Sequence, residues 1–261
     1  MFSSDLKIAL KAALEAGKKI IEFYDKNQFD IELKSDNSPL TLADRSSHNS
    51  IVKKLSKTDV PILSEEGAEI DYSIRKRWSK FWLIDPLDGT KEFIKKNGEF
   101  TVNIALIENQ VPILGVVYAP ELKELFFAEK SIGSIKVESI KEFEELKTKD
   151  LIELSKIIVP KDYTIVASRS HLNKETIEFI KEKKQNHKNV IIRQFGSSLK
   201  ICRIAERKAH CYPRLGPTME WDTAAAHAIV KYSGKKVVNS ISKDELTYNK
   251  ESLLNPFFIV Q

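Results

Sequence analysis

The stretch from residue 82 to residue 93 reads WLIDPLDGTKEF and joins an apolar run to two acids. Its first three residues are typical of the end of a buried strand. The next five, DPLDG, have the composition of a sharp turn, because proline fixes φ and glycine tolerates positive φ. Two carboxylates at the end of a buried strand are costly unless they are paired. We therefore expect a partner for Asp85 and Asp88.

Three further acids lie at predicted element boundaries. Glu65 follows a short apolar run, Asp44 lies in the first turn of a predicted helix, and Asp222 opens another helix. Each position has a structural explanation, since Asp44 can form a capping box with Thr41 and Asp222 can be an N-cap. Capping alone does not explain why apolar residues lead into each acid.

The alternative is that four of the acids converge in one cleft. These four are Glu65, Asp85, Asp88 and Asp222. Like charges about 4 Å apart repel by roughly 4 kcal/mol per pair at an effective dielectric near 20, so such a cluster needs cations. Carboxylates without histidine or thiolate favour hard divalent ions, in particular Mg²⁺ beside a substrate phosphate. The Leu87 carbonyl could face the same ion, and the Gly89 and Thr90 amides could hold phosphate if they open a helix.

Length and composition indicate a compact globular protein. The chain has 261 residues, of which 42% are hydrophobic and 30% charged, and this is typical of a folded domain with a substantial core. The net charge of +5 is dispersed, so polymeric nucleic acid is not an expected partner. Cys202 and Cys211 have no zinc spacing, and we expect free thiols in the cytoplasm. No apolar run reaches the roughly 18 residues of a membrane span, but peripheral membrane association is left open.

The periodicity of apolar residues predicts a layered α/β sandwich. Helices are expected over about residues 4–25 and from Ser38 to Leu55, and later over residues 173–184, 198–207 and 222–232. Strands are expected at residues 81–84, 101–107, 113–118, 125–128, 163–167 and 190–195, with a hairpin turn at 108–110. The first part predicts helices on an antiparallel sheet, and the second predicts alternating strand and helix.

The predicted elements form one domain over residues 1–261. Within it we expect a metal and phosphate part over roughly residues 1–155 and a nucleotide part over roughly residues 156–261. The segment 131–157 is rich in Lys and Glu and has few large apolar residues. We therefore expect a variable surface connection there.

The ordered acidic motifs resemble those of a known family. DPLDGT, the preceding SEEGA and the later WDTAA are similar to three signature segments of the inositol monophosphatase superfamily of Mg²⁺-dependent, lithium-sensitive phosphatases. The correspondence runs in the family's order from about residue 5 to residue 235. The resemblance implies the αβαβα sandwich of that family.

A longer similarity points to one branch of the superfamily. DPLDGTKEFIKKNGEFTVNIALIENQVPILGVVYAP resembles the bacterial CysQ-type 3'(2'),5'-bisphosphate nucleotidases, as do SRSH at 168–171, GSSLKICRIAE at 196–206 and YPRLGPTMEWDTAAAHAI at 212–229. This resemblance implies an enzyme of sulfur metabolism that converts adenosine 3',5'-bisphosphate (PAP) into AMP and phosphate. Its sulfated form PAPS would be a second substrate, converted to APS. The branch also implies a monomer, whereas resemblance to the inositol phosphatases implies a dimer.

The resemblance also implies roles for particular residues. Two or three Mg²⁺ ions would be bound by Glu65, Asp85, Leu87, Asp88 and Asp222. The catalytic residues would be Asp44, Thr90 and Glu65, with Asp44 and Thr90 orienting or deprotonating the attacking water. Substrate would contact Leu87, Asp88, Gly89, Thr90, His171, Ser197, Lys200, Arg214 and Asp222. The alternative for the nucleotide contacts is a strand-end histidine, a helix cap and two solvated cations.

One departure from the family pattern is visible, and two other functions are left open. Ala226 stands where the family usually has glycine, and we expect a small effect because alanine is the better helix former. The same metal site could serve an inositol or sugar phosphatase, but only a bisphosphate needs Lys200 and Arg214 for a second phosphate. A nucleotide- or metal-binding protein without catalysis would release no phosphate.

Overall fold

A seven-stranded sheet forms the centre of the molecule. The computed structural model describes residues 2–26, 32–33, 39–169 and 173–261. The strand order is β3-β4-β5-β6-β7-β8-β9, with β3 parallel to β4 and the other neighbours antiparallel. The bounds are β3 (Ile62–Ser64), β4 (Lys80–Asp88), β5 (Thr101–Glu108), β6 (Val111–Ala119), β7 (Glu124–Glu129), β8 (Gly133–Val137) and β9 (Ile152–Glu153).

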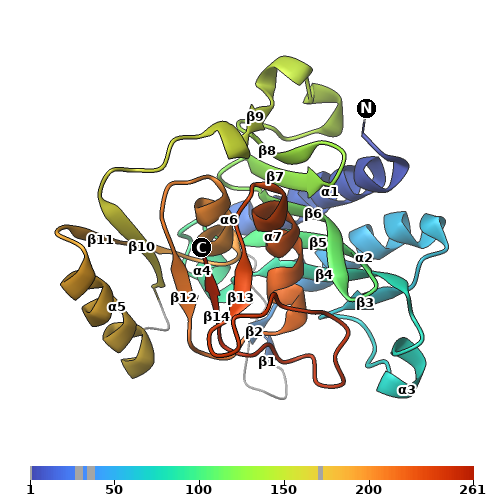
Figure 1. The fold of residues 1–261 in the computed structure, drawn as a ribbon. Coiled ribbons are helices and arrows are strands. Elements are labelled where there is room, and N and C mark those ends of the chain that lie inside the picture. The colour runs from blue at the N-terminus through green and yellow to red at the C-terminus, as the bar shows by residue number, and fades with distance from the viewer. Residues whose placement is uncertain (1, 27–31, 34–38, 170–172) are drawn as a thin grey trace.

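Helices cover both faces of this sheet (Figure 1). The helices α1 (Ser4–Lys26) and α2 (Leu42–Leu55) pack on one face, and α6 (Leu199–Ala205) and α7 (Glu220–Tyr232) pack on the other. Successive side chains of β4 face the α1–α2 layer and the α6–α7 layer alternately, because side chains alternate across a strand. Trp82 and Ile84 lie in the core under α1 and α2, whereas Leu83 lies in the core under α7.

A smaller group of strands extends the fold beyond α6. The parallel strands β10 (Tyr163–Ser168) and β11 (Val190–Phe195) are connected by α5 (Lys174–Asn186), and Figure 1 shows these three elements together at one side. A bridge between Ile165 and Cys211 joins β10 to the sheet β12-β14-β13. That sheet contains β12 (Tyr212–Arg214), β14 (Phe258–Val260) and β13 (Val237–Asn239).

Short elements complete the described chain. They are β1 (Glu32–Leu33), β2 (Pro39–Leu40), α3 (Tyr72–Arg75), α4 (Thr90–Ile94) and the 3-10 turns Ser56–Thr58, Phe143–Glu145, Thr148–Asp150 and Leu154–Lys156. The predicted strands are confirmed, with longer bounds for several of them. The predicted helices are confirmed too, except for the start of the second one: Pro39–Leu40 forms β2, so α2 begins at Leu42 and not near Ser38, which lies outside the described residues. Both cysteines are free, as expected, and both are buried. Across the described ranges, no helix combines the length and apolarity that a membrane span needs.

The predicted turn at DPLDG is wrong, because β4 continues through it to Asp88. Asp85 pairs with Asn103 and Asp88 pairs with Thr101, so two residues of β4 lie opposite one residue of β5. Such a bulge suits Pro86, which has no N–H to donate to the sheet. In a regular strand, residues three apart point to opposite faces. The extra residue in the bulge shifts the alternation of side chains by one position, so that Asp85 and Asp88 both point toward α6 and α7.

The predicted surface connection at 131–157 is also wrong in part, because it contains β8 and β9. Lys136 of β8 is only 1% exposed. Its ammonium nitrogen lies 2.8, 2.6 and 2.7 Å from carboxylate oxygens of Glu124, Glu138 and Glu206. Arg203 of α6 lies 2.6 Å from Glu124 and 2.8 Å from Glu206. These glutamates are close enough to hold a metal ion, but the two cationic side chains already supply the opposite charge.

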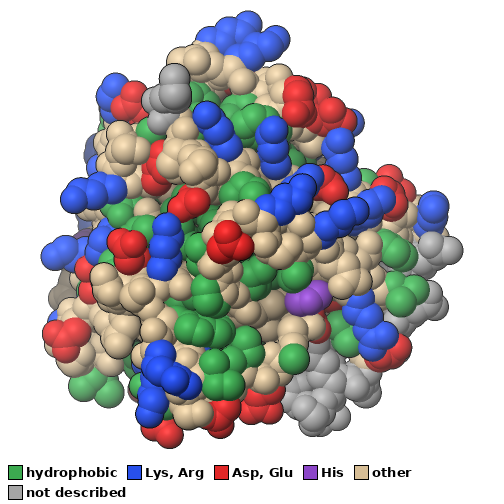
Figure 2. Space-filling model, turned by 90° about the vertical axis from the view of Figure 1, so that its right-hand side faces the viewer, with side chains coloured by type: hydrophobic (Ala, Val, Ile, Leu, Met, Phe, Trp, Pro, Cys, Tyr) green, Lys and Arg blue, Asp and Glu red, His purple; other side chains and the backbone are tan. Residues whose placement is uncertain are grey.

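The molecular surface carries both signs of charge. Figure 2 shows lysine and arginine side chains interspersed with acidic ones over the visible face. This agrees with the dispersed charge of the sequence and shows no continuous basic track on that face.

Gly115 of β6 allows α7 to approach the sheet closely. A Cβ at this position would lie 2.1 Å from the Ala225 carbonyl oxygen and 2.9 Å from the Ala228 Cβ. We expect Gly115→Ala to lower the free energy of unfolding by roughly 1–3 kcal/mol, because the helix must move away from the strand. Urea denaturation measures the change, with Gly216→Ala as the control, since Asn173 Nδ2, at 3.9 Å, is the one atom of the described residues within 4 Å of that Cβ. Equal stability losses for the two variants would contradict this close packing.

Candidate active site

Three carboxylates from separate segments meet between the sheet and α7. Glu65 follows β3, Asp85 begins the β4 bulge, and Asp222 lies in the first turn of α7. Each contributes an oxygen, and these oxygens all lie within 4.8 Å of one another. The backbone fixes two of them, because the Glu65 N–H donates to the Ile84 carbonyl at 3.2 Å and the Met219 N–H donates to Asp222 Oδ2 at 2.9 Å. Met219 is the N-cap of α7, so Asp222 lies inside the first turn and is not itself the N-cap.

Burial and mutual repulsion favour the protonated forms of these acids. Asp85 is 1% exposed. Its pKa is raised well above the usual value, first by burial and then by the charges of Glu65, Asp88 and Asp222. Burial, Asp88 and Glu65 likewise raise the pKa of Asp222 to about 8. A bound cation would reverse this effect, because it stabilises the ionised carboxylates.

The donor set fits a hard divalent cation. Every side chain in the three-acid group is a carboxylate, and no thiolate or imidazole belongs to it. Oxygen ligands of this kind suit Mg²⁺ and similar ions. The three carboxylates can thus provide the metal-binding part of an active site.

Asp88 lies beside these three acids and has polar partners of its own. Its Oδ2 lies 2.8 Å from the Ser198 hydroxyl and 3.4 Å from Asn103 Nδ2. The Ser198 hydroxyl also lies 2.6 Å from the Asp222 carbonyl oxygen. Ser198 therefore connects the N-terminal end of α6 to both β4 and α7. Neither Ser198 nor Asn103 belongs to an acidic motif, so their contacts with Asp88 could not be predicted from the sequence.

Asp44 caps α2 and also contacts Thr90. Its Oδ2 accepts from the Thr41 N–H at 2.8 Å and from the Thr41 hydroxyl at 2.6 Å, which confirms the capping box at the start of α2. Its Oδ1 accepts from the Thr90 hydroxyl at 3.3 Å. Gly89 is the N-cap of α4, with φ of 89°, and this conformation favours glycine. The helix opening on which phosphate binding by the Gly89 and Thr90 amides depends is therefore present.

A small hollow of about 80 Å³ adjoins the acidic cluster. Its lining includes Asp88, Ser197, Lys200, Arg214 and Asp222. Burial lowers the pKa of Lys200, while the charge of Asp88 opposes this shift. Arg214 donates from Nη2 to the Pro217 carbonyl at 2.7 Å. Within the described ranges, its Nε is buried without a hydrogen-bond partner.

The remaining predicted contact, His171, lies outside the described residues. The neighbouring Arg169 is described, and its Nη1 lies 3.1 Å from Glu99 Oε2. The same Glu99 oxygen accepts from the Gly196 N–H at 2.7 Å. Glu99 therefore links the end of β10 to the segment that precedes Ser197, a link that the sequence did not predict.

Comparison with known proteins agrees with this arrangement. A family model described as "Inositol monophosphatase family" matches residues 2–256. The chain belongs to the inositol monophosphatase family. This family is metal-dependent, and its fold is the predicted layered sandwich, so both the family resemblance and the fold prediction are confirmed.

The relatives within the inositol monophosphatase family include named nucleotidases. The chain is 41% identical over 258 residues to the 3'(2'),5'-bisphosphate nucleotidase CysQ of Salmonella typhimurium strain LT2, and 98% of each chain is covered. The crystal structure of CysQ from Bacteroides thetaiotaomicron matches with a TM-score of 0.92 and 48% identity, over 100% of this chain and 97% of that one. An IMPase from Thermotoga maritima matches with a TM-score of 0.75 and 25% identity, over 99% and 92%.

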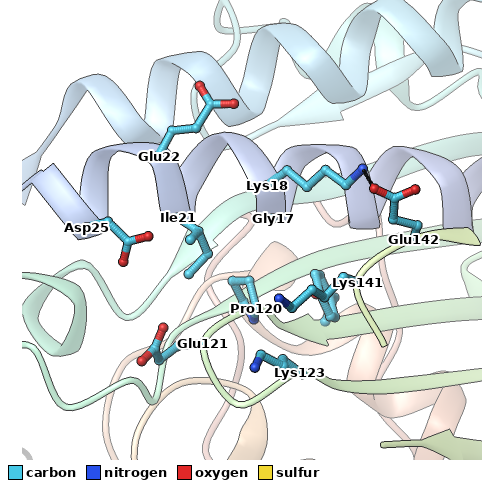
Figure 3. Close-up of a pocket in the computed structure, with 11 residues that line it drawn as sticks. Gly17, Lys18, Ile21, Glu22, Asp25, Pro120, Glu121, Lys123, Lys141 and Glu142 are labelled. Carbon is cyan, nitrogen blue, oxygen red and sulfur yellow. Dashed lines mark hydrogen bonds and ion pairs between the residues drawn. The ribbon is translucent and has the colours of Figure 1, made fainter. Parts of the chain in front are cut away.

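Another hollow lies between α1 and the turn that follows β6 (Figure 3). Its volume is about 450 Å³, and the Lys18 ammonium and Glu142 carboxylate pair at 2.5 Å along its wall. None of its lining residues belongs to the acidic cluster or to the hollow beside Lys200. Carboxylate chemistry, rather than hollow size, therefore locates the candidate active site of this family member.

Proposed function

We propose that the protein is a Mg²⁺-dependent 3'(2'),5'-bisphosphate nucleotidase. It would remove the 3'-phosphate of PAP and leave AMP and phosphate. Relatives that cover almost the whole chain carry this name. The observation that carries the proposal is the hollow in which Asp88 and Asp222 lie near Lys200 and Arg214. A substrate with two phosphates needs cations for the phosphate that is kept as well as a metal site for the one that is cleaved.

The metal part of the proposal involves five ligand positions. Two or three Mg²⁺ ions would be held by Glu65, Asp85, Asp88, Asp222 and the Leu87 carbonyl. When bound, Mg²⁺ lowers the pKa of a water molecule and neutralises the charge that develops on the leaving ribose oxygen. The raised pKa values of Asp85 and Asp222 support this assignment. They show that the ionised carboxylates are unfavourable together without a cation.

The chain's own polar groups would act on the water and on the phosphates. Asp44 accepts a hydrogen bond from Thr90, and this pair would orient the attacking water or accept its proton. The Gly89 and Thr90 amides would hold the 3'-phosphate. Lys200 and Arg214 would hold the 5'-phosphate, and the buried Nε of Arg214 offers a donor for it.

A direct comparison of substrates tests the proposed function. Phosphate release would be measured from PAP, inositol 1-phosphate and fructose 1,6-bisphosphate, with Mg²⁺ and then with added Li⁺. We expect phosphate to be released much faster from PAP than from the other two substrates, and we expect Li⁺ to suppress this release. Preference for the inositol or sugar substrate would replace the nucleotidase proposal with the other phosphatase, and no release from any substrate would indicate a binding protein.

Arg214→Ala should separate recognition of the second phosphate from catalysis. Loss of a charge-assisted hydrogen bond costs about 1.5–3 kcal/mol, so we expect the KM for PAP to rise roughly 10- to 100-fold. The KM for inositol 1-phosphate, which has one phosphate, should change far less. Arg193→Ala on the exposed strand β11 is the matched control. Equal changes for both substrates would count against a 5'-phosphate contact.

Several finer points stay predictions. They are the choice between PAP and PAPS, the number of ions, the contact from His171, the division at about residue 155, the monomeric state and the cytoplasmic location. The small effect expected of Ala226 also stays a prediction, although its side chain is fully buried in the core beneath α7.

A further inference from the structure

One face of α2 reaches three segments of the active site. Asp44, Ser47 and His48 lie three and four positions apart, and residues so spaced share one face of a helix. Asp44 accepts a hydrogen bond from Thr90, as described above. The other two side chains contact the segments that carry Asp85 and Glu65.

Ser47 fixes the bulge in β4. It is fully buried, and its hydroxyl donates to the Pro86 carbonyl oxygen at 2.7 Å. Pro86 lies between Asp85 and Asp88, where the regular pairing of β4 with β5 is interrupted. A carbonyl at such an interruption lacks a regular sheet partner. The Ser47 hydroxyl supplies a donor from the rigid helix and so fixes the backbone between the two acids.

His48 fixes the turn that carries Glu65. Its Nδ1 lies 2.9 Å from the Ser64 hydroxyl oxygen. That hydroxyl accepts from the Glu66 N–H at 3.3 Å, so its own proton can be donated to His48 Nδ1. The Gly67 N–H closes the same turn on the Ser64 carbonyl at 3.1 Å. The position of Glu65 is therefore coupled to α2 through Ser64.

We propose that Ser47 and His48 are positioning residues that set the separation of Glu65 from Asp85. The two segments already meet through the Glu65 N–H and the Ile84 carbonyl. Because both side chains belong to one rigid helix, α2 holds the turn after Ser64 and the β4 bulge in a fixed relation on the side of that backbone contact. Partners behind a metal ligand commonly change metal affinity about 10- to 100-fold when they are removed. The proposal rests on the proposed function because it takes Glu65 and Asp85 as metal ligands.

Ser47→Ala and Ser50→Ala form a matched pair for the first contact. Both serines lie on α2, but the Ser50 hydroxyl is buried without a hydrogen-bond partner among the described residues. Mn²⁺ binding to the metal-free full-length protein would be measured by electron paramagnetic resonance, together with the Mg²⁺ concentration for half-maximal PAP hydrolysis. We expect Ser47→Ala to raise the dissociation constant for Mn²⁺ and the half-maximal Mg²⁺ concentration about 10-fold each. The variant should keep most of its kcat at saturating Mg²⁺. Ser50→Ala should change neither.

A double-mutant cycle tests the second contact. His48→Ala and Ser64→Ala should each weaken Mn²⁺ binding, and the double variant should be no weaker than either single variant. His48→Asn, whose side chain can still hydrogen-bond, should recover part of the affinity. Thermal unfolding of each variant checks that the protein is folded.

The outcomes separate this inference from the proposed function. Wild-type affinity for Mn²⁺ in folded Ser47→Ala and His48→Ala proteins would overturn the positioning role and leave the nucleotidase proposal intact. Equal losses in Ser47→Ala and Ser50→Ala would also overturn it. A wild-type protein that binds no Mn²⁺ and releases no phosphate would overturn both.

Discussion

Asp85→Asn is expected to lower kcat for PAP at least about 100-fold, because a metal ligand contributes several kcal/mol to stabilisation of the transition state. The same substitution should stabilise the metal-free protein. Asp85 is 1% exposed, and its pKa is raised by burial and by neighbouring acids. An amide of the same shape carries no charge, and its oxygen can still accept the Leu87 N–H that now bonds to Asp85 Oδ1 at 3.1 Å.

Activity and stability should therefore move in opposite directions. Phosphate release at a series of Mg²⁺ concentrations measures the first quantity, and urea denaturation at pH 8 with a chelator measures the second. Asp244→Asn, an exposed acid outside the cluster, is the matched control and should change neither. Near-wild-type kcat in a folded Asp85→Asn protein would defeat the metal assignment. If the metal-free Asp85→Asn protein were less stable than the metal-free wild type, other groups of the protein would already stabilise the Asp85 carboxylate.

The main elements could be predicted from the sequence because their signals are local. Apolar residues at helical spacing defined α1, and alternating β-rich runs defined β5 and β6. The convergence of Glu65, Asp85 and Asp222 could be predicted from chemistry, because several acids after apolar runs need a common cation. A capping box at Asp44 was also predictable, since it depends on residues three positions apart.

Non-local partners were not predictable. Lys136 is charged, so the sequence around it suggested the surface, but glutamates from β7, from the C-cap of α6 and from the residue after β8 offset the cost of its burial. The bulge at Pro86 depends on pairing with β5 and on Ser47 of α2. Ser198 and His48 carry no motif signal, because their importance comes from contacts between segments far apart in sequence.

The metal-free protein should lose stability as the pH rises from about 4 to about 8. The pKa of Asp222 is about 8 in the folded state, raised from a reference value of 3.8. Between these values the folded state holds a proton that the unfolded state has released, so the free energy of unfolding falls with increasing pH. The stabilisation is complete below the unfolded pKa and disappears above the folded one. Asp85 shifts in the same direction. Each proton contributes a slope of at most about 1.4 kcal/mol per pH unit.

Mg²⁺ should remove this slope, because metal binding replaces the protons and favours the ionised carboxylates. Urea denaturation from pH 5 to pH 8, with chelator and with saturating Mg²⁺, measures the difference between the two states. Other titrating groups, such as His227 with its pKa lowered by burial, affect both curves and largely cancel in that difference. Asp85→Asn should reduce the slope of the metal-free curve, because the proton that Asp85 itself holds in the folded state is then missing. Parallel curves with and without Mg²⁺ would show that the acids do not exchange protons for a cation, and the metal site would have to be sought elsewhere.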